Sequence, residues 1–114
     1  MDLVGALHGN VNVVTVTGRI DQATANLFEE KLAVWLAPDS DGKGGVVLDF
    51  SGVDYISSVG LRVLMLAARQ VKAQNGEIAI TALTPVVAEV FQISRFNRVI
   101  AVHADVASAL LSLG

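Results

Sequence analysis

Strand-like and helix-like segments alternate along this chain, and this alternation restricts its fold more than any other feature of the sequence. Short β-branched apolar runs at residues 46–50 and 77–81 stand between longer segments with apolar residues at helical spacing. Strand-like runs at residues 3–7 and 11–17 open the chain, and residues 8–10 between them suit a hairpin turn. We therefore expect the order β, β, α, β, α, β, α, β, α. This order predicts an α/β fold, with a mixed sheet opened by an N-terminal hairpin and about four helices packed on it.

The composition indicates one compact domain. A chain of 114 residues can bury a core but is short for two domains, and 53% hydrophobic residues argue against long disordered tails. The longest apolar run, near residues 63–68, is much shorter than a membrane span. No basic region precedes the first apolar residues, so no secretory signal is evident. We expect residues 1–114 to form a single domain of a cytoplasmic protein that does not insert into membranes.

Several classes of site are excluded by what the sequence lacks. The chain has no cysteine, which excludes disulfides, thiolate metal sites and cysteine nucleophiles. Only His8 and His103 remain as neutral-pH bases or metal ligands. The net charge is -3 and the eight basic residues are scattered along the sequence, which does not indicate nucleic-acid binding. We expect protein partners, no cofactor, and a monomer.

Polar residues mark the starts of the expected helices. Asp21 is the expected N-cap of the first helix, which ends at Pro38. Thr84 followed by Pro85 is a strong start signal for the third helix, and Asp105 is expected to cap the last.

Two serines stand between the strand at residues 46–50 and the second helix. In that helix one apolar stripe is expected, formed by Leu61, Leu64, Met65, Ala68 and Val71, and Asn75-Gly76 should end it. The simplest interpretation is helix capping, in which Ser57 or Ser58 accepts a hydrogen bond from an amide of the first turn and contributes about 1 kcal/mol to stability. A helix start also tolerates a phosphate, so capping does not exclude phosphorylation.

Enzymatic and metal-binding interpretations fit the sequence poorly. A hydrolase elbow needs a glycine two residues on either side of the serine, but Ile56 stands two before Ser58. The "GKGG" stretch lacks the Walker spacing and is read as a turn. Asp21, Asp49 and Asp54 are each explained more simply, as a cap, a strand end and a turn residue. We expect no catalytic residue and no metal ligand.

The segments taken together resemble a known family. The stretch "VVLDFSGVDYISSVGLRVLMLAARQVKAQNGEIAI" and the following "LTPVVAEVFQIS" are similar to the STAS domain of bacterial anti-sigma factor antagonists. The earlier "VTGRIDQATANLFEEKL" resembles the same family, so the similarity covers nearly the whole chain. Arg19 stands where an acidic residue is common in the family.

The resemblance implies a phosphorylation switch. The family's target serine lies two positions before a glycine, which selects Ser58 before Gly60 and leaves Ser57 as the alternative. Ser57 stands where the family usually has aspartate, and Val59 where it has a small polar residue. Asp21 matches an aspartate beside the phosphorylation site. The implied partner-binding residues are Asp21, Ser57, Ser58, Val59, Gly60, Leu61 and Arg62.

The implied partners are an anti-sigma factor that is also a serine kinase, and a PP2C-like phosphatase. Unphosphorylated protein would bind the kinase and release the sigma factor, whereas phosphorylated protein would be released. The alternative within this fold is a STAS adaptor subunit of a lipid-transport complex, or of a sensory phosphorelay that controls no sigma factor.

Overall fold

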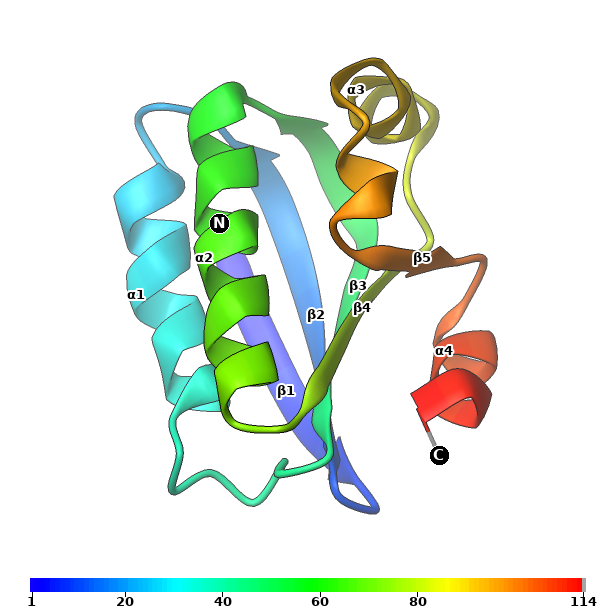
Figure 1. Cartoon of the computed structure of the whole chain (residues 1–114). Coiled ribbons are helices and arrows are strands. Elements are labelled where there is room, and N and C mark those ends of the chain that lie inside the picture. The colour runs from blue at the N-terminus through cyan, green and yellow to red at the C-terminus, as the bar shows by residue number, and fades with distance from the viewer. Residues whose placement is uncertain (114) are drawn as a thin grey trace.

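The computed structural model describes residues 1–113, and its strands form one mixed sheet in the order β1-β2-β3-β4-β5 (Figure 1). The hairpin of β1 (Asp2–His8) and β2 (Val11–Ile20) is antiparallel. Strands β3 (Gly45–Ile56), β4 (Glu77–Thr81) and β5 (Ala101–His103) then follow in parallel pairings. This arrangement confirms the mixed α/β sheet and its opening hairpin.

Helices cover both faces of the sheet. Figure 1 shows α1 (Ala25–Leu36) and α2 (Ser58–Ala73) side by side on one face, and α4 (Val106–Leu113) lies on the other. Helix α3 (Pro85–Ser94) and the short 3-10 helix η1 (Phe96–Arg98) lie near the carboxyl end of β3, at the same end of the molecule as the start of α2. None of the helices within residues 1–113 is long and apolar enough to cross a membrane.

The core is divided by the sheet because successive side chains of a strand point to opposite faces. On β2, Val14 and Val16 join the large cluster under α1 and α2, whereas Val11 and Val13 join a small cluster under α4. Strand β3 is buried on both faces over residues 45–48, as expected for a central parallel strand. The large cluster therefore anchors α1 and α2 at the face where the candidate site lies.

Helix boundaries followed the local signals with one exception. Helix α2 ends before Asn75, whose positive φ of 62° stops further helical winding, and α3 begins with Thr84 as N-cap and Pro85 as its first residue. The prediction that Asp21 caps α1 was wrong. Thr84 and Asp105 were placed correctly, but α1 has Thr24 at its N-cap because residues 21–24 first form a separate turn.

Strand β3 is longer than predicted. Asp49 does not end it and Asp54 is not in a turn, because both lie inside a strand that continues to Ile56. Two irregularities in its pairing with β2 allow this continuation, and at the first the Ser51 amide donates to Asp49 Oδ1 over 2.9 Å. Only tertiary pairing with β2 shows that this polar segment is strand. Strand β5 also begins two residues later than expected.

Candidate functional site at the start of helix α2

Ser57 is the N-cap of α2. Its Oγ accepts a hydrogen bond from the Gly60 amide at 3.4 Å, and its own amide donates to the Ile20 carbonyl at 2.8 Å. These contacts attach the start of α2 to the end of β2, and the side chain of Ser57 is half-buried. The interpretation of one serine as a helix cap is confirmed, and the capping serine is Ser57.

Ser58 is the first residue of α2 and is exposed, as is Val59 beside it. The two serines therefore differ in accessibility although they are adjacent. The side chain of Ser57 points back into the cap, whereas Ser58 lines an open hollow that extends along the helix. From solvent, Ser58 is therefore more accessible than Ser57.

Gly60 lets the first turn of α2 approach the sheet closely. A Cβ at this position would lie 2.6 Å from Ile20 Cγ2 and 2.7 Å from Ile56 Cγ1, both in fully buried side chains. Real Cβ atoms are almost never this close to another carbon. The glycine two residues after Ser58 therefore has a packing role. It lets residues 57–60, which we call the serine turn, pack directly against the ends of β2 and β3.

The loop between β2 and α1 lies next to this turn, since Asp21 directly follows the Ile20 that receives the Ser57 amide. Asp21 Oδ1 accepts from the amides of Ala23 and Thr24 at 2.9 and 3.2 Å, while Thr24 Oγ1 accepts from the Asp21 amide at 2.9 Å. The reciprocal bonds make residues 21–24 a tight turn. The structure thus brings Asp21 to the end of the sheet where Ser57 and Ser58 lie.

Arg19 compensates the charge of Asp21. Its Nε donates to Asp21 Oδ2 at 2.9 Å. This contact, together with the hydrogen bonds from the Ala23 and Thr24 amides, lowers the pKa of Asp21 below its usual value. The guanidinium carbon also lies 4.2 Å from the centre of the Tyr55 ring, a cation–π contact. Tyr55 lies opposite Arg19 only because of the irregular β2–β3 register, so sequence spacing could not have found this pair.

Apolar side chains continue from the serine turn along α2. Val59 is 40% exposed, and Leu61 is half-buried against the core. Together with Ser58, Arg62 and Phe96, Leu61 lines a shallow hollow of about 470 Å³. The predicted partner-binding residues of the segment 57–62 thus include exposed polar, apolar and basic side chains, apart from the buried Gly60. Apolar side chains beside polar and charged ones can form the centre and the rim of a protein interface.

The side chains considered for catalysis or metal binding are dispersed. His8 pairs with Val11, which lies beside the first residue of β3, whereas Ser58 follows the other end of that strand. His103 is on β5, paired with Thr81 of β4. Within residues 1–113 no three acidic or histidine side chains are grouped to hold a metal ion.

Comparisons with known proteins identify the family. The STAS domain model matches residues 6–109. BtrV of Bordetella bronchiseptica, which is named as an anti-sigma factor antagonist, is 42% identical over 84 residues, covering 74% of this chain and 70% of BtrV. These findings confirm the predicted family and favour the antagonist class over the adaptor alternative.

Solved structures share the fold. The crystal structure of an anti-sigma factor antagonist from Mycobacterium paratuberculosis has a TM-score of 0.86 at 23% identity, covering 98% of this chain and 92% of that one. The Bacillus cell fate determinant SpoIIAA, solved in its phosphorylated form, has a TM-score of 0.69 at 16% identity, covering 99% and 100%. At these identities the similarity concerns the fold, and the choice between Ser58 and Ser57 stays a prediction.

Proposed function

The chain belongs to the STAS domain family, and on that premise we propose that it is an anti-sigma factor antagonist switched by phosphorylation of Ser58. The unphosphorylated form binds a serine-kinase anti-sigma factor, which then releases its sigma factor. Phosphorylation by that kinase ends the binding, and a PP2C-like phosphatase restores it. Because the kinase uses ATP, the switch operates in the cytoplasm.

The observation that carries this proposal is the contrast between the two serines. Ser58 presents an exposed hydroxyl at the first position of α2, whereas the Ser57 hydroxyl serves the cap. The docking surface consists of Asp21 together with residues 57–62. Phosphorylation would leave the cap and the Gly60 contact unchanged, so no refolding is required.

The physical effect of the phosphate is local. It adds a charge of about -1.5 to -2 beside Val59 and Leu61, where an apolar contact would have to exclude water. A loss of roughly 3 kcal/mol in binding free energy weakens the complex about a hundredfold, which is sufficient for a switch. The chain itself acts as a binding module and the chemistry belongs to its partner kinase.

The direct test is incubation with the cognate kinase and ATP, followed by intact-mass measurement and peptide mapping. We expect one phosphate, on Ser58, which is absent from Ser58→Ala and retained in Ser57→Ala. A protein that binds the kinase but carries no phosphate on either serine would contradict the switch. A phosphate on Ser57 alone would move the switch to the capping residue.

A further inference from the structure

A groove runs along α2 from Ser58 toward the carboxyl end of the helix, and we call it the α2 groove. Its first part is the hollow of about 470 Å³ between α2 and Phe96 of η1. A second hollow of about 970 Å³ shares Met65 and Arg69 with the first and continues between α2 and the strands β4 and β5. The groove is thus continuous with the candidate docking surface.

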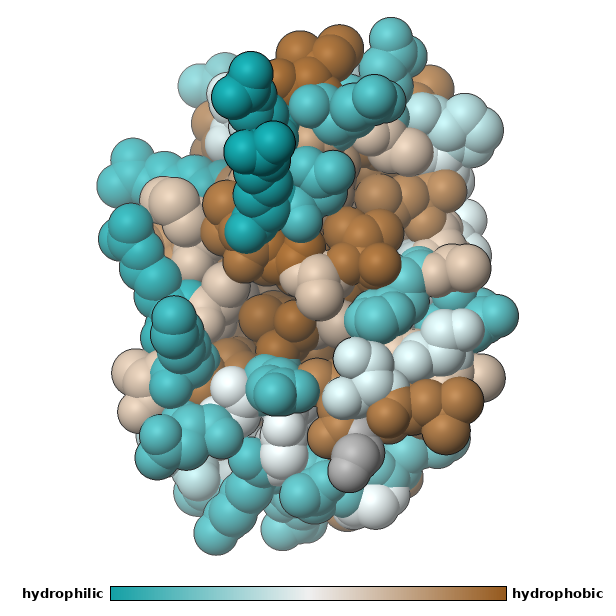
Figure 2. All heavy atoms as spheres, turned by 45° about the vertical axis from the view of Figure 1, so that its right-hand side comes forward, coloured by the Kyte–Doolittle hydropathy of each residue, from teal (hydrophilic) through white to brown (hydrophobic). Residues whose placement is uncertain are grey.

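The floor of the α2 groove is apolar. Met65 lies where the two hollows join, Leu66 is 41% exposed on the helix side, and Val99 is 51% exposed on the opposite side. Figure 2 shows hydrophobic side chains gathered at the centre of a face that is rimmed by hydrophilic ones. Apolar side chains exposed together in this way mark a surface that another molecule can cover.

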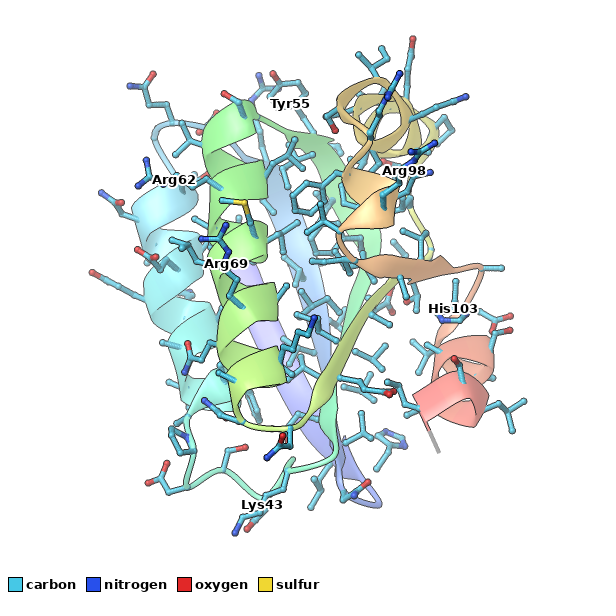
Figure 3. The ribbon with its side chains drawn as sticks, in the orientation of Figure 1. Lys43, Tyr55, Arg62, Arg69, Arg98 and His103 are labelled. Carbon is cyan, nitrogen blue, oxygen red and sulfur yellow. The ribbon has the colours of Figure 1, made fainter. Side chains whose placement is uncertain are left out.

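The rim of the groove on α2 is basic. Arg62, Arg69 and Lys72 are exposed and line one hollow or the other, and the ion pair found within residues 1–113 involves none of them. Figure 3 shows Arg98 and His103 on η1 and β5, across from Arg69. Glu77 is the acidic side chain that lines the far hollow. The chain as a whole carries a net charge of -3, so this positive rim is a local feature.

We propose that the α2 groove receives an acidic amphipathic segment of the anti-sigma factor, which extends the interface beyond the serine turn. This inference rests on the proposed function. The apolar floor complements one face of such a segment, and the rim complements its carboxylates. From Ser58 to Lys72 the helix rises about 21 Å, which is the length of about 14 helical residues of a partner.

The same placement explains how one phosphate acts on a larger interface. Ser58 and Arg62 line the same hollow, one turn apart on α2. A phosphate on Ser58 brings negative charge to the end of a groove that receives negative charge, and it competes for Arg62 with the carboxylates of the partner. Phosphorylation therefore weakens both the apolar contact at Val59 and the electrostatic contact along α2.

Arg69→Glu tests the groove without changing the serine turn, and Lys43→Glu is the matched control. Figure 3 shows Lys43 in the loop at the opposite end of the molecule from Arg62, and both substitutions change the net charge by the same amount. The probe is the purified cognate anti-sigma factor kinase. We expect Arg69→Glu to raise the Kd about tenfold, mainly through slower association. The Kd of this variant should also depend less on the salt concentration than that of the wild-type chain. Lys43→Glu should leave the Kd unchanged.

The outcomes separate this inference from the proposed function. Equal Kd values for the wild-type chain and both variants, with Ser58 still phosphorylated, would overturn the groove while the switch stands. Absence of kinase binding by the wild-type chain would overturn the switch itself. Thermal unfolding of both variants checks that they are folded. If the wild-type chain binds phosphatidylglycerol vesicles, Arg69→Glu abolishes that binding, and the Kd for the kinase does not change, the groove would be assigned to a membrane surface and the proposal overturned.

Discussion

The first turns of α2 and α4 are both capped by a side chain, but the cap of α2 is neutral and the cap of α4 is negatively charged. In α2, the Gly60 amide donates to the neutral Ser57 hydroxyl at 3.4 Å, and in α4 the Ser108 amide donates to the Asp105 carboxylate at 2.8 Å. A helix start carries partial positive charge, which the carboxylate compensates and the hydroxyl does not. The comparison teaches that a start capped by a neutral residue keeps the capacity to accept a phosphate nearby.

The two turns also differ in how closely they approach the sheet. The third residue of α2 is Gly60, which has no room for a Cβ, whereas the third residue of α4 is the exposed Ser108. The start of α2 is therefore rigidly placed by Ile20 and Ile56. A modification on Ser58 changes the surface of this turn and leaves its position unaltered.

The largest effect is expected from placing a permanent charge on the α2 turn. Ser58→Asp should weaken kinase binding by up to about a hundredfold, since a carboxylate then lies beside the apolar contact residues. The same substitution in the first turn of α4, Ser108→Asp, should leave the affinity unchanged. Titration calorimetry measures both, and equal losses for the two variants would show that net charge matters instead of position.

Gly60→Ala should destabilise the fold by about 1–3 kcal/mol, because the new Cβ overpacks two buried isoleucines. Ser108→Ala, at the corresponding position of α4, should change the free energy of unfolding by less than about 0.5 kcal/mol. Urea unfolding of both variants checks this difference. If Gly60→Ala leaves the free energy of unfolding unchanged, the first turn of α2 is not packed against the sheet as the structure indicates.

Ser57→Ala should cost about 0.5–1 kcal/mol of unfolding free energy, at the low end for an N-cap because its hydrogen bond is long. Phosphorylation of Ser58 should persist, since the hydroxyl that accepts the phosphate is unchanged. Urea unfolding and a kinase assay on the same sample separate the two roles. Loss of phosphorylation in a folded Ser57→Ala protein would contradict the assignment of capping to Ser57 and phosphorylation to Ser58.

The smallest effect concerns pH. The Ser108 amide and hydroxyl lower the pKa of Asp105 below 3.8, so its cap stabilises the fold above that pH and is lost as the pH falls through the lowered pKa. The Ser57 cap does not titrate. We expect the stability difference between wild type and Asp105→Asn to shrink below about pH 4, while that for Ser57→Ala stays constant. Urea unfolding midpoints from neutral to acidic pH measure this difference. If the midpoints of wild type and Asp105→Asn differ by the same amount at every pH, the prediction is contradicted.

Local signals in the sequence predicted most of the elements, and they failed where two elements had to meet. Asn75-Gly76, Thr84-Pro85 and Asp105 each act within a few residues, so their placement could be anticipated. Asp21 is as good an N-cap residue as Asp105, but its contacts with Thr24 and Arg19 form a turn before α1. A choice between two local structures of this kind depends on where β2 ends.

The candidate site divides in the same way. The pattern of two serines and a glycine, together with the family resemblance, located the turn at residues 57–60 and selected Ser58. The Arg19–Tyr55 contact and the continuity of the α2 groove with Phe96 and Val99 were not anticipated. These pairs come from different elements, and their meeting depends on sheet register and helix packing.

By itself the sequence determined the alternation of strands and helices, the family, and a helix start with serines on it, because periodicity, capping and turn preferences act over short distances. Only the tertiary structure decided which serine is the cap and which is exposed. That decision comes from the bond between the Ser57 amide and the Ile20 carbonyl, and from the packing of Gly60 on Ile20 and Ile56. The contacts of Ser57 and Gly60 with Ile20 join residues that are far apart in the sequence, so no local rule in the chain specifies them.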